Sequence, residues 1–509
     1  MTKILLGYEA TTANSASRKE IYADFDRLVN PHVMICGDTG TGKTHTIRRC
    51  INEAIRTSTK DLRIHVFDVH GDINIDPKIC SEIEFSEASE YGFNPLKINP
   101  DPRYGGVRKC IQNFISTLRL SSTTSRALGP KQQDVLRNLL TDVFEQAGFF
   151  AEDPSTWHTS AEEPPEGLIG GRIYIDLPFH DREVAKKLVD GTTADLAWHG
   201  AVKCWHVAVY DGPITRWPVK AWSRINPTLR TLVAYATRRR EMSFTGLGQK
   251  EAALMEVVHK RAKALNSRLQ QRAKTRNNDN GAFENEEADK ELDKAKADCL
   301  NAFKDYFATV EQGNAIDSLL KYDSFESLST VKQILDSLLA SGIFRDTQPR
   351  FDPRKPVWRY NIKALSAEEQ KFLVNFRLRE IFAHAVQEGE QDKVVEIAVI
   401  DEGAKFVEDD DDHIVNVIAM EARKFGLGIW FLSQSPTQFP EILLSSVATK
   451  LILGLDANYW PVAQRRLRIE ERAMKWIRPR EGMLANFKLA GQSAQNWVWV
   501  TTPDPSAAR

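Results

Sequence analysis

Eight consecutive residues near the N-terminus have the types and spacing that bind the phosphates of a nucleotide. Residues 37–44 read Gly-Asp-Thr-Gly-Thr-Gly-Lys-Thr and match the pattern G-x-x-x-x-G-K-[ST] in full. In this pattern backbone N–H groups surround phosphate oxygens, the lysine neutralises the β- and γ-phosphates, and the threonine hydroxyl binds Mg²⁺. We therefore expect Lys43 and Thr44 to bind ATP and Mg²⁺. The other expected nucleotide-binding residues of this phosphate loop are Gly37, Thr39, Gly40, Thr41 and Gly42.

Two adjacent carboxylates supply the second half of such a site. Residues 395–402 read Val-Glu-Ile-Ala-Val-Ile-Asp-Glu, an apolar strand that ends in Asp401 and Glu402. The carboxyl ends of strands are where α/β sheets bind ligands, and hydrolysis needs oxygen ligands for Mg²⁺ and a positioned water. We expect Asp401 to belong to the Mg²⁺ and nucleotide site. Glu402 is expected to orient and polarise the attacking water.

Further polar residues follow two other strands. Residues 68–72 read Asp-Val-His-Gly-Asp and end the strand that comes after the helix of the phosphate loop. Gln434 ends the strand at 427–433. Both segments should open onto the same edge of the sheet, where Gln434 either senses the γ-phosphate or holds the water. The alternative for Gln434 is an ordinary exposed loop residue.

The elements that must position these residues form an α/β fold with a mainly parallel sheet. Short β-rich runs at 33–36, 64–68, 394–401 and 427–433 are each followed by glycine-rich turns or a helical pattern. Two runs are near the N-terminus and two near the C-terminus, so a long insertion splits one ATPase domain. We expect its first part at 1–150, a small aromatic-rich module at 165–225, a helical insertion at 226–340 and its second part at 341–509.

The insertion contains two segments with open alternatives. Residues 251–305 are rich in helix-forming residues, are broken near 277–281, and have a basic first arm and an acidic second arm. This pattern predicts either a helical hairpin with complementary charges or a basic arm that contacts nucleic acid. Residues 172–222 alternate like strands and contain clustered aromatic residues, which either form the core of the small module or stack on single-stranded nucleic acid.

Length, composition and charge limit the class of protein. The chain has 509 residues, enough for about two to four compact units. Its formal net charge is -1, so any surface that binds nucleic acid must be a local basic patch. The six cysteines have no paired spacing, which argues against a disulfide framework or a zinc ribbon and fits a cytoplasmic location. No apolar run is long enough for a bilayer, and we expect no membrane partner.

The order of the motifs resembles the HerA/FtsK superfamily of DNA-pumping ATPases, and is most similar to HerA and the type IV secretion ATPases. The resemblance covers about residues 20–150 and 320–500. It rests on the phosphate loop, the 68–72 segment, Phe-Asn-Pro-Leu at 93–96, Leu-Gly-Pro-Lys-Gln-Gln at 128–133, Asp-Glu at 401–402, Glu-Ala-Arg-Lys-Phe-Gly at 421–426 and Ser-Gln-Ser-Pro at 433–436.

The resemblance implies a RecA-like P-loop NTPase core and a homo-hexamer that threads double-stranded DNA through its centre. It also implies a nuclease or another effector protein as partner. Carried over to this sequence, Glu402 activates water, Gln434 is a sensor, and Arg423 is an arginine finger that reaches a neighbouring subunit. Arg423 could instead be a solvated helix residue, and Arg465 and Arg466 are rival candidates.

We therefore expect a HerA-like hexameric DNA translocase or helicase, acting in prokaryotic anti-phage defence or DNA processing. The alternative is a regulatory ATPase ring that gates a partner effector, a nuclease or an NAD-degrading enzyme, with little translocation. A protein that only holds nucleotide would not need the carboxylate of Glu402. The acidic run at 408–412 would repel DNA phosphates, so we expect it on an outer or inter-subunit surface.

Overall fold

A computed structural model describes most of the chain. The described residues are 2–13, 15, 17–59, 61–121, 128–159, 166, 168, 172–189, 196–208, 219–220, 222, 224–245, 249–278, 286–310, 321–322, 324–345, 347–492 and 496–502. They fall into two compact units. Unit 1 comprises Met1–Pro95, Ser116–Ser125 and Ser341–Arg509, and unit 2 comprises Leu96–Ile115 and Arg126–Ala340. The chain thus first passes from unit 1 into unit 2 near residue 95, whereas the sequence suggested a domain boundary near residue 150.

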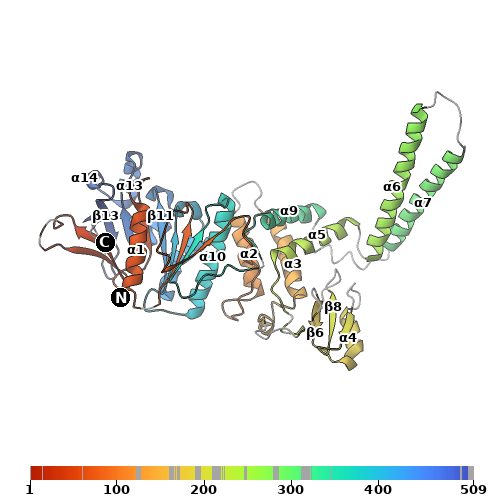
Figure 1. The fold of residues 1–509 in the computed structure, drawn as a ribbon, viewed down its shortest axis with the longest axis horizontal. Coiled ribbons are helices and arrows are strands. Elements are labelled where there is room, and N and C mark those ends of the chain that lie inside the picture. Colours follow the sequence, from red (N-terminus) through yellow and green to blue (C-terminus); the bar gives the residue numbers. More distant parts are fainter. Residues whose placement is uncertain are drawn as a thin grey trace. The chain divides into compact units, whose positions relative to one another are not determined.

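Unit 1 is built on one large sheet (Figure 1). Among the described residues this sheet has 11 strands in the order β2-β1-β14-β13-β12-β3-β11-β10-β4-β9-β5. The strands are β1 (Lys3–Glu9), β2 (Glu20–Asp24), β3 (Val33–Cys36), β4 (Arg63–Asp68), β5 (Cys80–Glu84), β9 (Val357–Asn361), β10 (Glu396–Ile400), β11 (Leu427–Ser433), β12 (Thr449–Ile452), β13 (Gly482–Phe487) and β14 (Val498–Thr501). Neighbours from β12 to β5 pair in parallel. The pairs from β12 to β2 are antiparallel.

The parallel part confirms the fold class that the sequence predicts. The four expected runs correspond to β3, β4, β10 and β11, and β3 and β11 are buried along their whole length. Strands buried on both faces read as continuous apolar runs, which is why these were visible in the sequence. The antiparallel extension was not predicted, because β1, β13 and β14 carry no motif.

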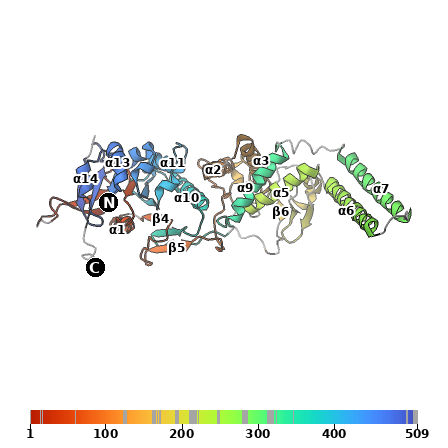
Figure 2. The same ribbon diagram turned by 90° about the horizontal axis from the view of Figure 1, so that it is seen from above.

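Helices cover both faces of this sheet (Figure 2). Helix α1 lies on one face and adds Ile47, Cys50, Ile51 and Ala54 to the core of that face. Helices α10 and α11 lie on the other face, where α11 contacts β11. The helices of unit 1 are α1 (Lys43–Thr57), α10 (Ala367–Glu388), α11 (Ile414–Glu421), α12 (Glu441–Ser446), α13 (Trp460–Leu467) and α14 (Glu471–Trp476).

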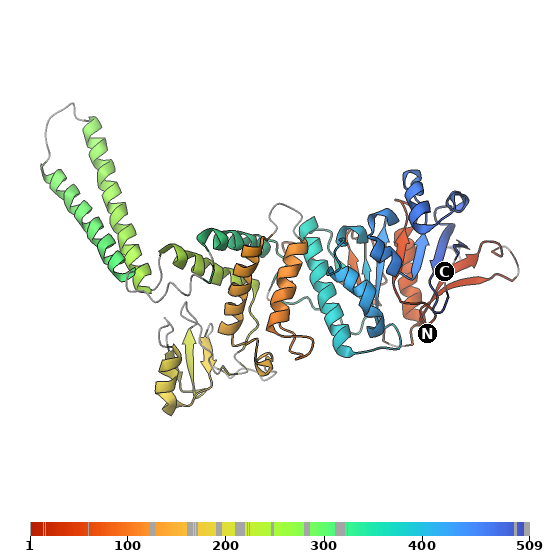
Figure 3. The ribbon, with the colours of Figure 1, turned by 180° about the vertical axis from the view of Figure 1, so that it is seen from behind.

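Unit 2 is mainly helical (Figure 3). Its helices are α2 (Val107–Ser121, which ends within unit 1), α3 (Pro130–Gln146), α4 (Arg182–Val189), α5 (Leu229–Thr245), α6 (Gln249–Asn278), α7 (Glu286–Val310) and α9 (Phe325–Ala340). Helix α3 packs against α5 and α9, which explains why it belongs to unit 2. Helices α6 and α7 pack together as the expected hairpin, and Arg261 of the basic arm is 3.4 Å from Asp298 of the other arm. Contact of this arm with nucleic acid stays a prediction.

A small sheet in unit 2 contains the clustered aromatic residues. Its strands β6 (Arg172–Ile175), β8 (Cys204–Ala208) and β7 (Leu196–His199) pair antiparallel in that order. Tyr174 and Trp205 are buried, as expected for core residues, whereas Phe179 is 60% exposed. Tyr210 and Trp217 lie outside the described residues.

The described helices include none that is both long and apolar enough to cross a membrane. All six cysteines are buried free thiols. This agrees with the absence of a paired spacing in the sequence.

Candidate nucleotide site

The phosphate loop lies between two parallel strands at the carboxyl edge of the sheet. It connects β3 to α1, which begins at Lys43. The backbone N–H of Gly37 donates to the carbonyl of Ser433 at 3.1 Å, and that of Asp38 donates to the carbonyl of Gly454 at 2.9 Å. The loop is therefore fixed between the ends of β11 and β12, with the N-terminus of α1 at its far end.

Glycines and the lysine give the loop its form. Gly42 has a φ of 99°, and a Cβ on Gly37 would lie 2.4 Å from Oγ1 of Thr41. Side chains at these two positions would strain or block the turn. The Nζ of Lys43 donates to the carbonyls of Gly37 at 2.6 Å and of Asp38 at 3.3 Å. The loop's own carbonyls thus hold the ammonium group where the pattern places it against phosphate.

The expected carboxylates follow β10 at the same edge. The N–H of Asp401 donates to the carbonyl of Phe67 at 3.0 Å, which continues the ladder between β10 and β4. Oδ1 of Asp401 accepts from the N–H of Glu402 at 3.0 Å. The Asp401 residue is only 6% exposed, and its Oδ2 is buried with no hydrogen-bond partner among the described residues.

The surroundings of Asp401 disfavour its negative charge. Burial raises its pKa to about 6. His70 opposes this rise, and the carboxylates of Asp68, Glu402 and Asp72 add to it. A carboxylate in this position is stabilised by a cation or by protonation.

Glu402 is held in an unusual backbone conformation. Its φ of 49° and ψ of 44° are left-handed, which costs a non-glycine residue free energy and is typical of functional sites. Its side chain is 12% exposed. Oε1 of Glu402 lies 3.4 Å from Nε2 of Gln434 and 3.4 Å from Nε2 of His70. Two strand ends, those of β4 and β11, therefore converge on one carboxylate from β10.

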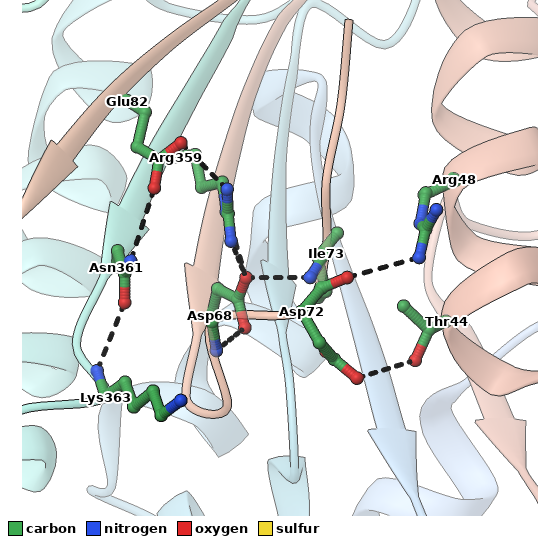
Figure 4. Close-up of polar contacts among 10 residues, drawn as sticks. Thr44, Arg48, Asp68, Asp72, Ile73, Glu82, Arg359, Asn361 and Lys363 are labelled. Carbon is green, nitrogen blue, oxygen red and sulfur yellow. Dashed lines mark hydrogen bonds and ion pairs between the residues drawn. The ribbon is translucent and has the colours of Figure 1, made fainter.

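A buried ion pair fixes the turn after β4 (Figure 4). Asp68 is fully buried, and its Oδ2 accepts from Nη2 of Arg359 at 2.7 Å and from Nε at 2.9 Å. Its Oδ1 accepts from the N–H of Gly71 at 2.7 Å, and its Oδ2 also accepts from that of Ile73 at 2.9 Å. Both oxygens of Asp68 are thus used to shape the segment that carries Asp72.

This turn brings Asp72 to the phosphate loop. Oδ2 of Asp72 lies 3.4 Å from Oγ1 of Thr44, and Arg48 of α1 donates to the Asp72 carbonyl at 3.2 Å. Figure 4 shows the Asp72 side chain directed at Thr44. Carboxylate oxygens of Asp68, Asp72 and Asp401 all lie within 4.8 Å of one another. Hard oxygen ligands at this density suit a divalent cation such as Mg²⁺.

The three finger candidates lie in different settings. Arg423 is exposed, in the turn Ala422–Phe425 that follows α11. Arg465 is also exposed, on α13. Arg466 instead donates to Glu441 and to the carbonyls of Thr437 and Phe439 at 2.8–3.0 Å. Arg466 is therefore tied to its own subunit, which does not suit a residue that must reach a neighbour.

Sequence reasoning missed two contacts of the site. The ion pair of Asp68 with Arg359 had one visible signal, a charged residue within the otherwise apolar Val-Trp-Arg-Tyr run of β9. Burying such a residue requires an opposite charge. The approach of His70 to Glu402 had no signal, since the histidine lies on a turn and is half exposed.

Comparisons with known proteins found one family model and several solved structures similar to this chain. Residues 10–102 match the model of the central domain of the helicase HerA. The structure of VirB4 of Thermoanaerobacter pseudethanolicus matches with a TM-score of 0.55 and 11% identity, over 99% of this chain and 98% of that one. The bacterial plasmid coupling protein TrwB, in complex with ADP and Mg²⁺, matches with a TM-score of 0.46 and 11% identity, over 99% of this chain and 95% of that one. No curated protein matches the sequence.

The matched segment contains the phosphate loop and the 68–72 turn, and the fold match extends over the whole chain. Residues 10–102 are thus similar to the HerA central domain, and the chain as a whole shares the fold of VirB4, with Lys43, Asp401 and Glu402 at one edge of the parallel sheet.

Proposed function

We propose that this protein is an ATP-driven DNA motor, which hydrolyses ATP with Mg²⁺ and moves double-stranded DNA through a ring of six subunits. The observation that carries the hydrolytic part is the convergence of three strand ends beside the phosphate loop. Asp401 and Glu402 from β10, Gln434 from β11 and the 68–72 turn from β4 all reach the site of Lys43 and Thr44. A site that only held nucleotide would not need this arrangement.

Each residue has a distinct role in this proposal. Lys43 and the loop N–H groups bind the phosphates of ATP. Glu402 accepts a proton from the attacking water and orients it, because its carboxylate is partly exposed at the same edge. Gln434 holds that carboxylate in place through its amide and senses the γ-phosphate.

The residues present fit the Mg²⁺ that this chemistry needs. Thr44 offers a hydroxyl, and the unpartnered Oδ2 of Asp401 offers a buried carboxylate oxygen. A cation there would favour the ionised form of Asp401, which burial otherwise opposes. When bound, Mg²⁺ neutralises charge on the phosphates during transfer.

The proposal of a ring that binds DNA is supported by the HerA resemblance and by the positions of charged residues. Arg423 is exposed, and the described residues offer it no carboxylate partner, so it is available to complete the site of a neighbouring subunit.

Because the net charge of the chain is -1, DNA would have to contact a surface where basic residues are gathered. Lys260 and Lys263 on the basic arm of the hairpin are exposed and suited to phosphate contact. The acidic run is partly neutralised within unit 1, since Asp410 pairs with Arg119 at 3.5 Å.

The proposed setting is prokaryotic anti-phage defence or DNA processing, with a nuclease or another effector as partner. It rests on resemblance alone. The regulatory alternative, a ring that gates an effector with little DNA translocation, has the same ATP site. The two differ in what stimulates hydrolysis.

The test compares DNA binding and DNA stimulation of hydrolysis across salt concentrations. A motor that neutralises several phosphates should bind duplex DNA and lose roughly a thousandfold in affinity over a fourfold rise in salt. ATP turnover should rise when duplex DNA is added at low salt. Absence of binding in a gel-shift titration at low salt with nucleotide, combined with stimulation by the effector, would support the regulatory ring instead.

A further inference from the structure

We propose that Asp72 contributes its carboxylate to the Mg²⁺ shell of the nucleotide, as a third protein ligand beside Thr44 and Asp401. The inference rests on the proposed function, because it assigns a further residue to the same ATP site. Neither the phosphate loop nor the Asp-Glu pair after β10 contains this residue. It comes from the turn after β4 and depends on how that turn folds back.

The spacing of the oxygen atoms is the first observation. A Mg²⁺ ion with oxygens at about 2.1 Å places adjacent ligands about 3 Å apart and opposite ligands about 4.2 Å apart. Oγ1 of Thr44 and Oδ2 of Asp72 are 3.4 Å apart, and the carboxylate oxygens of Asp72 and Asp401 lie within 4.8 Å. These separations are slightly wider than an octahedron requires, so small side-chain movements would let all three bind one ion.

The second observation concerns Asp401 and is independent of how many acidic residues gather there. Asp401 is 6% exposed, and its Oδ2 has no hydrogen-bond donor among the residues that the structure describes. Buried carboxylate oxygens are otherwise hydrogen-bonded or bound to metal. Carboxylate oxygens of Asp401 and Asp72 lie within 4.8 Å of each other, so one cation can contact both residues.

The third observation separates the roles of the acidic residues. Both oxygens of Asp68 already accept backbone N–H bonds, and Arg359 neutralises its charge. Among the described residues, the carboxylate of Asp72 accepts no backbone N–H bond and forms no ion pair. Within the described ranges its hydrogen bond is the one with Thr44, and the fold holds its backbone through Arg48 rather than its side chain. The two carboxylates without a cation, Asp72 and Asp401, therefore share the charge that Mg²⁺ would balance.

The test measures metal affinity directly, with Mn²⁺ as a paramagnetic substitute for Mg²⁺. Asp72→Asn keeps the size of the side chain and the backbone contact with Arg48, so the fold should be preserved. Mn²⁺ affinity of the complex with ADP is measured by electron paramagnetic resonance, and ADP affinity is measured separately with the metal chelated. We expect Mn²⁺ affinity to fall at least tenfold and metal-free ADP affinity to stay the same.

Asp76→Asn is the matched control. Asp76 is an exposed aspartate four positions along the same segment, outside the group of carboxylates, and its substitution should leave Mn²⁺ affinity unchanged. The inference is overturned if Asp72→Asn binds Mn²⁺ as tightly as the unmodified protein while Asp401→Asn binds it more weakly. If the unmodified protein does not bind ADP with or without metal, the proposed ATPase function fails as well, which is a separate outcome.

Discussion

Nε2 of Gln434 lies 3.4 Å from Oε1 of Glu402, although the two residues are 32 positions apart in the chain. The distance is short because β11 pairs in parallel with β10, so both strands end at the same edge. Strand β11 also pairs with β3 on its other side. Gln434 therefore lies between the phosphate loop and the carboxylates, which is the position that its proposed sensor role requires.

Replacing Gln434 should slow the chemical step. We expect Gln434→Ala to lower kcat by about a hundredfold with little change in KM, because the amide orients Glu402 and contributes little to the affinity for ATP. The exposed position of Gln434 makes a folding defect unexpected. Steady-state ATPase kinetics check this. An increase in KM at constant kcat would show that Gln434 contacts substrate in the ground state and does not support the reaction.

Mixing two inactive variants should test whether the site is shared between subunits. Lys43→Ala subunits keep Arg423, and Arg423→Ala subunits keep an intact phosphate loop. If Arg423 acts in trans, mixed rings contain some complete sites and should recover part of the activity, since an arginine finger contributes roughly 10³ to 10⁵ in rate. The measurement is ATPase activity after subunit exchange, which is followed by a fluorescent label.

The same experiment with Arg465→Ala in place of Arg423→Ala compares the two exposed candidates. Recovery with Arg465→Ala alone would reassign the finger to α13. If subunits exchange and neither mixture recovers activity, although Arg423→Ala is inactive by itself, Arg423 acts within its own subunit or supports the fold.

The ion pair between Arg359 and Asp68 should be important for stability. Arg359→Met leaves the fully buried carboxylate of Asp68 without its guanidinium, which typically costs about 3–5 kcal/mol. Denaturant unfolding should show this loss. Asp68→Asn combined with Arg359→Met removes both charges and should restore part of it. A double variant that is less stable than Arg359→Met would contradict a compensating pair.

Of the seven parallel strands among the described residues, the sequence predicted β3, β4, β10 and β11, because each is a largely apolar run followed by a motif. The loop at 37–44, the strand before Asp401 and the strand before Gln434 were all placed correctly. The antiparallel strands β1 and β14 were not predicted, because they lie at opposite ends of the chain and pair only through tertiary structure.

The site was predictable only where residues belong to one motif. Lys43, Thr44, Asp401 and Glu402 follow from local patterns. The approach of Asp72 to Thr44 depends on a turn shaped by Asp68, whose partner Arg359 is 291 residues away. No local sequence pattern predicts a contact between residues so far apart in the chain. The chain first passes into unit 2 near residue 95 rather than at the expected boundary near residue 150, because α3 packs with α9, a contact between segments far apart in the sequence.

A buried histidine should make stability depend on pH. His32 is fully buried, its Nδ1 accepts from the N–H of Ile429 at 3.1 Å, and burial lowers its pKa to about 3. The unfolded chain protonates this histidine below about pH 6.5, whereas the folded chain keeps it neutral. The stability that neutral His32 contributes is thus fully present above pH 6.5. As pH falls toward 3, the free energy of unfolding decreases by about 1.4 kcal/mol per pH unit.

Urea unfolding of unmodified protein and of His32→Gln between pH 5 and 7 checks this slope. For the variant, the slope of the free energy of unfolding against pH should be smaller by the contribution of about one proton, whatever its stability at pH 7. His384→Gln, which changes an exposed histidine of α10, should leave the slope unchanged. Equal slopes for His32→Gln and the unmodified protein would show that His32 takes up its proton in the folded state.

We expect this site to hydrolyse ATP with Glu402 as the group that activates water. The most direct measurement is a single-turnover assay of Glu402→Gln with radiolabelled ATP and Mg²⁺, with Lys43→Ala as the comparison. Glu402→Gln keeps the size of the side chain and removes the proton acceptor, so it should bind ATP as the unmodified protein does and retain it uncleaved. Lys43→Ala should bind ATP weakly, because it lacks the phosphate-facing charge. Near-normal turnover by Glu402→Gln would contradict the account.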